Sequence, residues 1–456
     1  MKYFFTCLLF NVLTLNAQNS WNVSLVFNWN DTTLPVAFPY SNIYNEIWGF
    51  EVNGHDYAVI GSTNGTHIFD VSNTDSIYER LYVPGADQGE TIIHRDYHDY
   101  KGYLYMVCQE GASTIQILNI SMLPDTAFIV YDSDSVFSQA HNIFIDTSSG
   151  IMYGGYVRKL YPAPTMYGMS AYDLSDPLSP VEIYDQNLNV HDIYARNDTV
   201  YLNAASDGLE VYDFSNPSSP MFLGSLTGYA FQGYNHSGWL TDDGKYYIMS
   251  DEDHGYPMKM CDVQNLNDIE VISHVSSGVD PNSIPHNQII HGDYLYVAYY
   301  HDGLYVYDIS DPLNVNVCGF YDTYLPPDHS SYKGAWGVYP FLGPDKVLLS
   351  DMQTGLYVLD VTNALNYNII EDRAKSEIKI YPNPSSGFIN INVVDNSKLP
   401  LKVKLFNVSG KMLFEKILHD ENDQIKIGHL NIEGLVFCEV YADDGLKLKE
   451  RIFVVK

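Results

Sequence analysis

Five histidines recur in this chain at almost constant intervals, and an imidazole can bind a transition metal or exchange a proton near neutral pH. They belong to seven restarts of one pattern, separated by 46, 47, 50, 45, 50 and 50 residues: Trp48, His94, His141, His191, His236, His286 and Trp336. If every restart holds the same place in a repeated structural unit, the five imidazoles converge on one axis. The spacing therefore predicts a ring of histidines.

A second set of polar side chains follows the restarts by 15 or 16 residues. In an antiparallel hairpin the end of the second strand returns beside the start of the first, so these side chains are expected at the same rim. They are Glu110, Asp207, Asp251, Glu252, His301, Asp302 and Asp351. Imidazole and carboxylate groups together hold Zn, Mn, Fe or Cu in proteins. The two sets predict a candidate site for a divalent metal ion, with the five histidines of the first set as its ligands.

The same residues also have a structural interpretation. An imidazole at the start of each unit can hydrogen-bond to the backbone of the next unit, or can line a binding surface without any metal. Aromatic side chains near the restarts can stack on a sugar, although packing in a core is their commoner use: Trp48, Trp336, Tyr299 and Tyr339. The chain contains no nucleophile elbow, Walker loop, dinucleotide fingerprint or His-Glu-x-x-His motif. Two function classes stay open, a ligand- or partner-binding scaffold and a metal-dependent hydrolase or oxidase.

The elements that must position these residues are short β-strands. Units of 45 to 50 residues built from short β-rich runs are typical of a β-propeller, in which each unit is one four-stranded blade. We predict an all-β protein with a seven-bladed propeller over residues 45–370. Residues 23–29 should pair with an edge of the first or last blade, because an unclosed propeller leaves exposed edge strands.

An aspartate ends the third strand of most units. In the unit that begins at His286, the run Leu304-Tyr305-Val306-Tyr307 is followed by Asp308-Ile309-Ser310-Asp311-Pro312. Aspartate side chains accept hydrogen bonds from backbone N–H groups two residues on, so we expect six such residues to cap turns: Asp70, Asp173, Asp213, Asp262, Asp308 and Asp360.

The N-terminus has the features of a secretory signal. Lys2 precedes a mostly apolar run, Tyr3 to Leu15, and Ala17 offers a small residue at the cleavage point. The run is too short for a membrane anchor, so we predict a signal peptide over residues 1–17 and an N-terminal segment over 18–44. The cysteines that follow the signal are too few and too irregularly spaced for a disulfide framework: Cys108, Cys261, Cys318 and Cys438.

The C-terminal segment differs from the rest in charge and in pattern. From Glu371 onward basic and acidic residues are equal in number, 13 of each, so the whole net charge of −32 belongs to the preceding residues. An acidic surface of this kind repels nucleic acid and anionic membranes. After a linker at 372–377, strand-like alternation such as Lys402-Val403-Lys404-Leu405-Phe406 predicts a small β-sandwich in the last part of the chain.

Third strands of the form Gly-Leu-Tyr-Val-Tyr-Asp-Ile-Ser-Asp-Pro, as in residues 303–312, resemble the LVIVD repeat. The run from Trp48 to Asp360 resembles the choice-of-anchor B family of secreted propellers in landmarks such as Ala140-His141-Asn142 and Pro285-His286-Asn287. That family usually has Trp-Arg-Asp where this chain has His94-Arg95-Asp96, a departure that adds one imidazole. The resemblance implies a propeller and implies no particular reaction.

The tail is similar to the C-terminal sorting domain of type IX secretion cargo in Bacteroidetes. The similarity rests on Tyr381-Pro382-Asn383-Pro384, on the turn Asn407-Val408-Ser409-Gly410 and on the basic end of the chain. We therefore expect a sorting domain over residues 376–456. The resemblance implies handling by the type IX secretion machinery and a secreted or cell-surface location, with an extracellular ligand that the sequence does not name.

Overall fold

A computed structural model describes residues 19–367, apart from 39 and 327, and part of residues 378–454, with gaps at 382–384, 386, 394–398, 408–410, 421, 431–433 and 443–444. The chain divides into two compact units, Met1–Ala364 and Leu365–Lys456. The predicted signal peptide at 1–17 and the linker at 372–377 lie outside the described residues.

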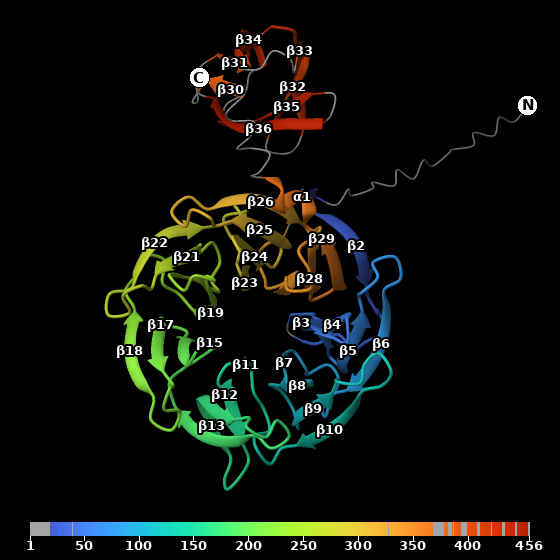
Figure 1. The fold of residues 1–456 in the computed structure, drawn as a ribbon, viewed down its shortest axis with the longest axis vertical. Coiled ribbons are helices and arrows are strands. Elements are labelled where there is room, and N and C mark those ends of the chain that lie inside the picture. Colours follow the sequence, from blue (N-terminus) through green and yellow to red (C-terminus); the bar gives the residue numbers. More distant parts are fainter. Residues whose placement is uncertain are drawn as a thin grey trace, which may run out of the picture. The chain divides into compact units, whose positions relative to one another are not determined.

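Within residues 19–367 the strands form seven antiparallel sheets that follow one another around a centre (Figure 1). The first three sheets each hold four strands. The first contains β3 (Tyr44–Val52), β4 (His55–Ser62), β5 (Gly65–Asp70) and β6 (Tyr78–Pro84). The second contains β7 (Arg95–Tyr100), β8 (Tyr103–Cys108), β9 (Ile115–Asn119) and β10 (Phe128–Ser133). The third contains β11 (Asn142–Asp146), β12 (Ile151–Lys159), β13 (Thr165–Asp173) and β14 (Val181–Gln186).

The remaining four sheets continue this order. The fourth contains β15 (Asp192–Arg196), β16 (Thr199–Asn203), β17 (Leu209–Asp213) and β18 (Met221–Leu226). The fifth contains β19 (Asn235–Leu240), β20 (Tyr246–Asp251), β21 (Met258–Asp262) and β22 (Glu270–Val275). The sixth contains β23 (Asn287–His291), β24 (Tyr294–Ala298), β25 (Leu304–Asp308) and β26 (Asn316–Tyr321). The seventh contains β27 (Ala335–Tyr339), β28 (Lys346–Asp351) and β29 (Gly355–Asp360).

The innermost strand of each sheet contacts that of the next, and β27 contacts β3, so the ring of sheets is closed. This arrangement is a β-propeller. Buried apolar side chains of neighbouring sheets pack together; Tyr105 of β8 and Ile143 of β11, for example, share one cluster. The core therefore lies between sheets and surrounds the axis.

The N-terminal strands complete the outer edges of the last two sheets. β2 (Ser24–Trp29) pairs antiparallel with β29, from Ser24 opposite Asp360 to Trp29 opposite Leu356. This confirms the prediction that residues 23–29 cover an edge of the first or last blade. β1 (Ser20–Trp21) adds a fifth strand beside β26, which the sequence pattern did not predict.

The six aspartates at the ends of the third strands cap turns, as predicted. In each case a side-chain oxygen accepts a hydrogen bond from the backbone N–H two residues later, at 2.7–3.0 Å. Cys108, Cys261, Cys318 and Cys438 are buried, and none of these four forms a disulfide.

The structure corrects the register of the first unit. In both β3 and β27 a bulge interrupts the pairing near the axis, at residues 45–46 in β3 and at 336–337 in β27. Asn45 is therefore the counterpart of Trp336, and Trp48 lies three residues further along the strand. The step of 46 residues from Trp48 to His94 lies within the range of the other units, so the spacing alone could not reveal that Trp48 is three residues out of register.

The second unit is also built of strands. One sheet has the order β30 (Ile378–Tyr381), β31 (Phe388–Val393) and β34 (Asn422–Lys426). The other has the order β33 (Met412–Leu418), β32 (Leu401–Asn407), β35 (Gly434–Ala442) and β36 (Gly445–Val454). Apolar residues of both sheets, such as Ile391 and Val403, form one buried cluster. The described helices are short, α1 (Thr362–Leu365) and η2 (Gly428–Leu430), and none of them is long and apolar enough to cross a membrane.

Candidate functional site

The five repeated histidines lie next to one another around the axis of the propeller. Successive ring centroids are 4.8 Å apart for His94 and His141, 4.2 Å for His141 and His191, 4.1 Å for His191 and His236, and 4.4 Å for His236 and His286. Trp336 closes the circle, at 4.7 Å from His286 and 5.4 Å from His94. We call these five imidazoles the histidine ring.

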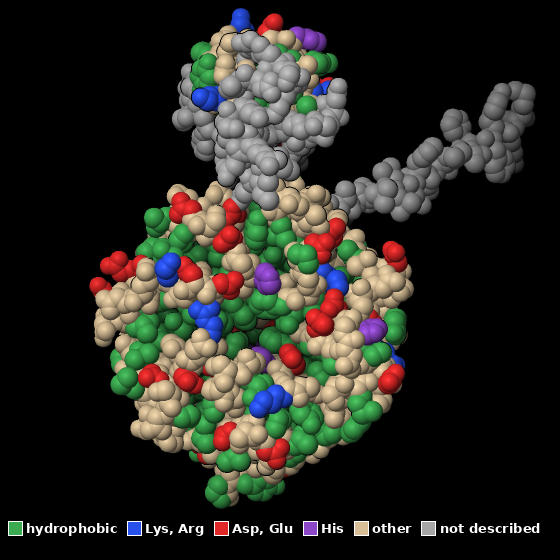
Figure 2. All heavy atoms as spheres, in the orientation of Figure 1, with side chains coloured by type: hydrophobic (Ala, Val, Ile, Leu, Met, Phe, Trp, Pro, Cys, Tyr) green, Lys and Arg blue, Asp and Glu red, His purple; other side chains and the backbone are tan. Residues whose placement is uncertain are grey.

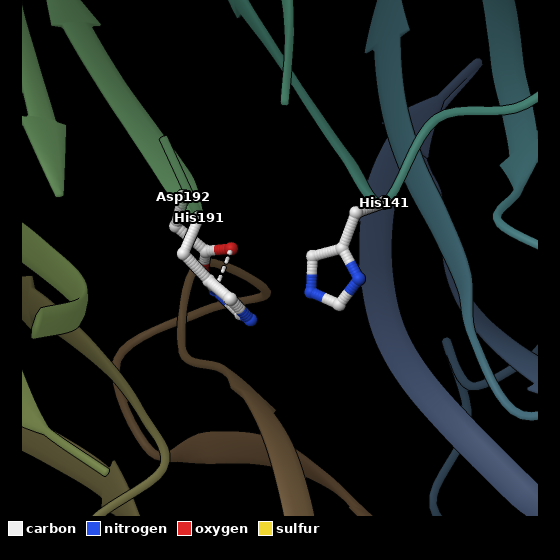
Figure 3. A group of neighbouring side chains, drawn as sticks. All are labelled: His141, His191 and Asp192. Carbon is white, nitrogen blue, oxygen red and sulfur yellow. Dashed lines mark hydrogen bonds and ion pairs between the residues drawn. The ribbon is translucent and has the colours of Figure 1, made fainter. Parts of the chain in front are cut away.

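The histidine ring follows from where the innermost strands begin. His94, His141, His191 and His286 each immediately precede an innermost strand, and His236 is the second residue of β19. Because the innermost strands line the axis, equivalent side chains of successive sheets face the same space. Figure 3 shows His141 and His191 pointing toward one another from neighbouring sheets.

The histidine ring borders a cavity of about 510 Å³, which we call the central cavity. The face drawn in Figure 2 is hollowed at its centre, and acidic side chains outnumber basic ones around it. Besides the histidines, the lining is mostly aromatic: Tyr40, Gln109, Tyr156, Tyr234, Glu252, Asp253, Tyr300, Tyr332 and Trp336. A cavity of this size admits a small organic ligand.

Four of the five imidazoles are oriented through their Nδ1 atoms. His94 Nδ1 lies 2.5 Å from Glu110 Oε1, and His141 Nδ1 lies 2.5 Å from Gln109 Oε1. His191 Nδ1 lies 3.0 Å from Asp192 Oδ1 (Figure 3), and His286 Nδ1 lies 2.5 Å from the Trp336 carbonyl oxygen. These partners can only accept a hydrogen bond, so each Nδ1 carries the proton. The Nε2 atoms are left with their lone pairs, as in histidines that bind metals.

Two groups of these side chains are close enough to share one metal ion. The ligand atoms of His141, His191 and Asp192 lie within 4.8 Å of one another, and so do those of His191, His236 and Glu252. Glu252 Oε2 is 3.9 Å from His236 Nε2, and Glu252 Oε1 is 3.9 Å from His286 Nε2. Tyr300 donates a hydrogen bond of 2.6 Å to Glu252 Oε1. The second group therefore combines two imidazoles with a carboxylate that a tyrosine holds in place.

Burial keeps much of the histidine ring neutral. It lowers the pKa of His141 and His236 well below the usual value, with further lowering from neighbouring imidazoles. Burial also lowers the pKa of His286 to about 3 and raises that of Glu252. Neutral imidazoles are the form that binds metal ions.

The second predicted set does not converge on the axis. Glu252 lines the central cavity, and Glu110 contacts the histidine ring through His94. Asp207 is exposed, and Asp351 is buried where its Oδ1 accepts the N–H groups of Gln353 and Thr354. Asp251 is fully buried in an ion pair with Lys259, with 2.5 Å between Oδ2 and Nζ.

His301 and Asp302 form a separate cluster with His329. His329 Nε2 is 2.9 Å from Asp302 Oδ1, and the rings of His301 and His329 are 4.9 Å apart. His301 is 2% exposed, and burial lowers its pKa to about 4. None of the three borders the central cavity.

The aromatic residues that were predicted to stack on a ligand do not lie together in the structure. Trp336 lines the central cavity, whereas Tyr299 and Tyr339 are buried in apolar clusters between sheets. Trp48 packs against Tyr339, and its Nε1 donates a hydrogen bond of 2.9 Å to Asp99 Oδ1. Trp48 lies three residues beyond Asn45, the counterpart of Trp336.

Several lining residues were not singled out from the sequence. Gln109 and Tyr156 stand 15 residues after their histidines, so the same spacing marks them, but neither is a carboxylate. Tyr300, which the sequence did mark beside Tyr299 as a stacking residue, lines the cavity as well. Tyr156 and Tyr300 adopt left-handed backbone conformations, with φ of +47° and +37°. Such conformations are costly for bulky residues and cluster at functional sites, but they leave no mark in a sequence.

Comparisons with known proteins agree with this architecture. Residues 379–455 match the secretion system C-terminal sorting domain family. Residues 189–227 and 288–323, in the fourth and sixth sheets, match the LVIVD repeat. The sorting domain indicates export by type IX secretion and attachment at the cell surface.

Similar solved structures include propellers of distant sequence. The β-propeller domain of Myceliophteria thermophila Cps50 (Swd1) is 12% identical, with a TM-score of 0.48, over 70% of this chain and 97% of that one. PorZ of Porphyromonas gingivalis, a surface component of the type IX secretion system, is 14% identical, with a TM-score of 0.44, over 93% of this chain and 61% of PorZ. The computationally designed protein Ika8 is 12% identical, with a TM-score of 0.45, over 72% of this chain and 99% of that one. No curated protein matches the chain.

Proposed function

We propose that the protein is an exported, cell-surface β-propeller that binds a small ligand or a partner in its central cavity. The observation that carries this proposal is the convergence of five histidines and an aromatic wall on one cavity of about 510 Å³. The left-handed conformations of Tyr156 and Tyr300 support it, because strained backbone is retained where it positions functional side chains.

The same proposal includes the finer architecture. Each of the seven sheets is one blade of a seven-bladed propeller over residues 45–370, after a signal peptide at 1–17 and an N-terminal segment at 18–44. The two sheets of residues 376–456 are the faces of a small sandwich that acts as the sorting domain. The landmarks quoted above support membership in the choice-of-anchor B family.

The cavity wall suggests a polar, hydroxyl-rich ligand such as a sugar, since Trp336 and the tyrosines offer flat faces and the tyrosine hydroxyl groups offer hydrogen bonds. A thermal-shift panel of monosaccharides and disaccharides with the purified protein tests this. We expect a stabilising sugar whose effect disappears in Trp336→Ala. Trp48→Ala is the matched control, because Trp48 lies outside the central cavity. A sugar that stabilises both variants as well as the parent protein would contradict binding in this cavity.

A second candidate function is a metal-dependent hydrolase or oxidase. The observation that favours it is the orientation of the imidazoles, in which acceptor groups hold four Nδ1 atoms and leave the Nε2 atoms free to bind a metal. His191, His236 and Glu252 would hold the ion, which would act as a Lewis acid toward a substrate in the central cavity. Tyr300 would keep Glu252 oriented through its hydrogen bond.

Elemental analysis of the purified protein, combined with Zn²⁺ titration, distinguishes the two functions. The metal-dependent function predicts about one equivalent of a transition metal in the protein, lost when His191→Ala and His236→Ala are combined in a folded variant. His301→Ala is the matched control and should keep the metal. Less than about a tenth of an equivalent, with a melting temperature unchanged by EDTA or Zn²⁺, would exclude the metal-dependent function and leave the scaffold.

A further inference from the structure

A second layer of polar side chains lies directly beyond the histidine ring, on the same innermost strands. It consists of Glu46 of β3, Asp96 of β7, Asn142 of β11, Asp192 of β15 and Asn287 of β23. Together these side chains line a cavity of about 30 Å³ that four ring histidines and Trp336 also border. We call the five side chains the oxygen layer, because each can offer an oxygen atom.

The oxygen layer gathers three carboxyl groups and no ammonium group. Arg95 is the basic residue that borders the cavity, but its guanidinium donates hydrogen bonds to the carbonyl oxygens of Ser62 and Asp87, both at 2.8 Å. Burial, and repulsion from Asp96 and then Asp192, raise the pKa of Glu46 well above its usual value. Negative charge placed away from water is stable only when a cation or a proton balances it.

The hydrogen bonds to Glu46 and Asp96 come from uncharged donors. Glu46 accepts the N–H of Ile47 at 3.0 Å and the side-chain amide of Asn287 at 2.8 Å. Asp96 accepts the N–H of Ile143 at 2.6 Å. These bonds fix the orientation of Glu46 and Asp96 without neutralising them.

Several side-chain amide atoms of this region have no hydrogen-bond partner among the described residues. The Oδ1 atoms of Asn142 and Asn287 are buried and make no hydrogen bond. Gln288 is 3% exposed, and neither its amide oxygen nor its amide nitrogen is paired. Gln288 and all five members of the oxygen layer line an adjoining cavity of about 80 Å³. Buried carbonyl oxygens without a donor are uncommon, and a bound ion or water satisfies them where they occur.

We propose that the oxygen layer binds one hard divalent cation, Ca²⁺, on the axis of the propeller. The donors are carboxylate and amide oxygens, the ligands that Ca²⁺ takes in sets of six to eight with flexible geometry. Zinc prefers nitrogen and sulfur ligands, and Mg²⁺ demands a strict octahedron that side chains from five separate sheets do not readily build. The ion balances the carboxylates, satisfies the unpaired amide oxygens and joins five sheets at their innermost strands.

Calorimetric titration of the EDTA-treated full-length protein with CaCl₂ tests the proposal. We expect one Ca²⁺ per chain and a rise in melting temperature at millimolar CaCl₂. Glu46→Gln combined with Asp96→Asn should weaken binding at least about tenfold, because two of the three charges are removed. Asn142→Ala removes one oxygen and no charge, and should weaken binding by a smaller factor. It serves as the second variant if the first does not fold.

Two controls change polar side chains outside this site. The exposed Asp207→Asn should leave Ca²⁺ binding unchanged. His301→Ala should also leave it unchanged, because His301 borders neither the histidine ring nor the oxygen layer. Ca²⁺ binding that persists unchanged in both oxygen-layer variants, or no Ca²⁺ binding by the parent protein at millimolar concentration, would overturn the proposal.

Discussion

The starts of the innermost strands and the ends of the second strands lie side by side in each sheet, but their polar side chains have different surroundings. The strand starts carry the histidine ring, whose members all face the central cavity. The strand ends carry Glu252 in the cavity, Asp251 in a buried ion pair and Asp207 at an exposed turn. One strand spacing of about 4.8 Å separates the two regions. Convergence on the axis is thus complete for the histidines at the strand starts and only partial for the polar residues at the strand ends.

This difference predicts that polar side chains at the ends of the second strands contribute more to stability than to binding. Asp251 provides the test with the largest expected effect. Lys259→Met leaves the Asp251 carboxylate buried without a counterion, since both side chains are 0% exposed. We expect the free energy of unfolding to fall by about 3–5 kcal/mol in denaturant titration. Lys346→Met is the matched control, because its ion pair with Asp56 is partly exposed and should be worth about 0–1 kcal/mol. Equal losses in the two variants would show that burial does not distinguish these pairs.

The histidines at the starts of the innermost strands should instead make the free energy of unfolding depend on pH. The pKa of His286 is about 3 in the folded protein and about 6.5 in an unfolded chain. The unfolded chain therefore binds the proton more tightly. The contribution of neutral His286 to the free energy of unfolding is fully present above about pH 6.5, and it is lost as the pH drops from there toward 3. His286 should contribute about 1.4 kcal/mol per pH unit in this window, and His141 and His236 change in the same direction.

Carboxyl groups with raised pKa values oppose this trend, so the parent protein must be compared with a variant. Burial raises the pKa of Asp96 to about 8, which favours the folded state as the pH falls toward 4. In His286→Asn the free energy of unfolding should fall less steeply between pH 6.5 and 5, and the difference should equal about the contribution of one imidazole. Denaturant titration of parent and variant at each pH measures this difference. An identical slope in parent and variant would mean that His286 is not neutral in the folded protein.

The smallest expected effect concerns the turns at the outer side of the sheets. Asp308→Ala removes the hydrogen bond of 2.8 Å from the Ser310 N–H and should cost about 1 kcal/mol, visible as a lower melting temperature. Asp207→Ala, at an exposed position in another sheet, should change stability by less than about 0.5 kcal/mol. If Asp207→Ala proves the more harmful change, the strand ends carry a role that their surroundings do not reveal.

The sequence by itself determined the parts of the protein that repeat. Regular spacing identified the histidines, and an aspartate two residues before a backbone donor identified each turn cap, because both depend on local geometry that every sheet shares. The same is true of the N-terminal strand that closes the ring, since an open edge needs a partner. The LVIVD-like strands and the sorting tail were also readable, because their motifs are contiguous.

Only the tertiary structure decided which of the regular positions meet. The strand pairing placed Trp48 three residues beyond the counterpart of Trp336. At the end of β20, Glu252 lies in the central cavity while the preceding Asp251 pairs with Lys259. Two of the Nδ1 partners, Gln109 and Trp336, come from a neighbouring sheet, and the oxygen layer joins sheets that lie far apart in the chain. Glu46 and Asn287, for example, meet through a hydrogen bond although 241 residues separate them. A repeat determines the place of a residue within its own unit, and ring closure then determines its neighbours.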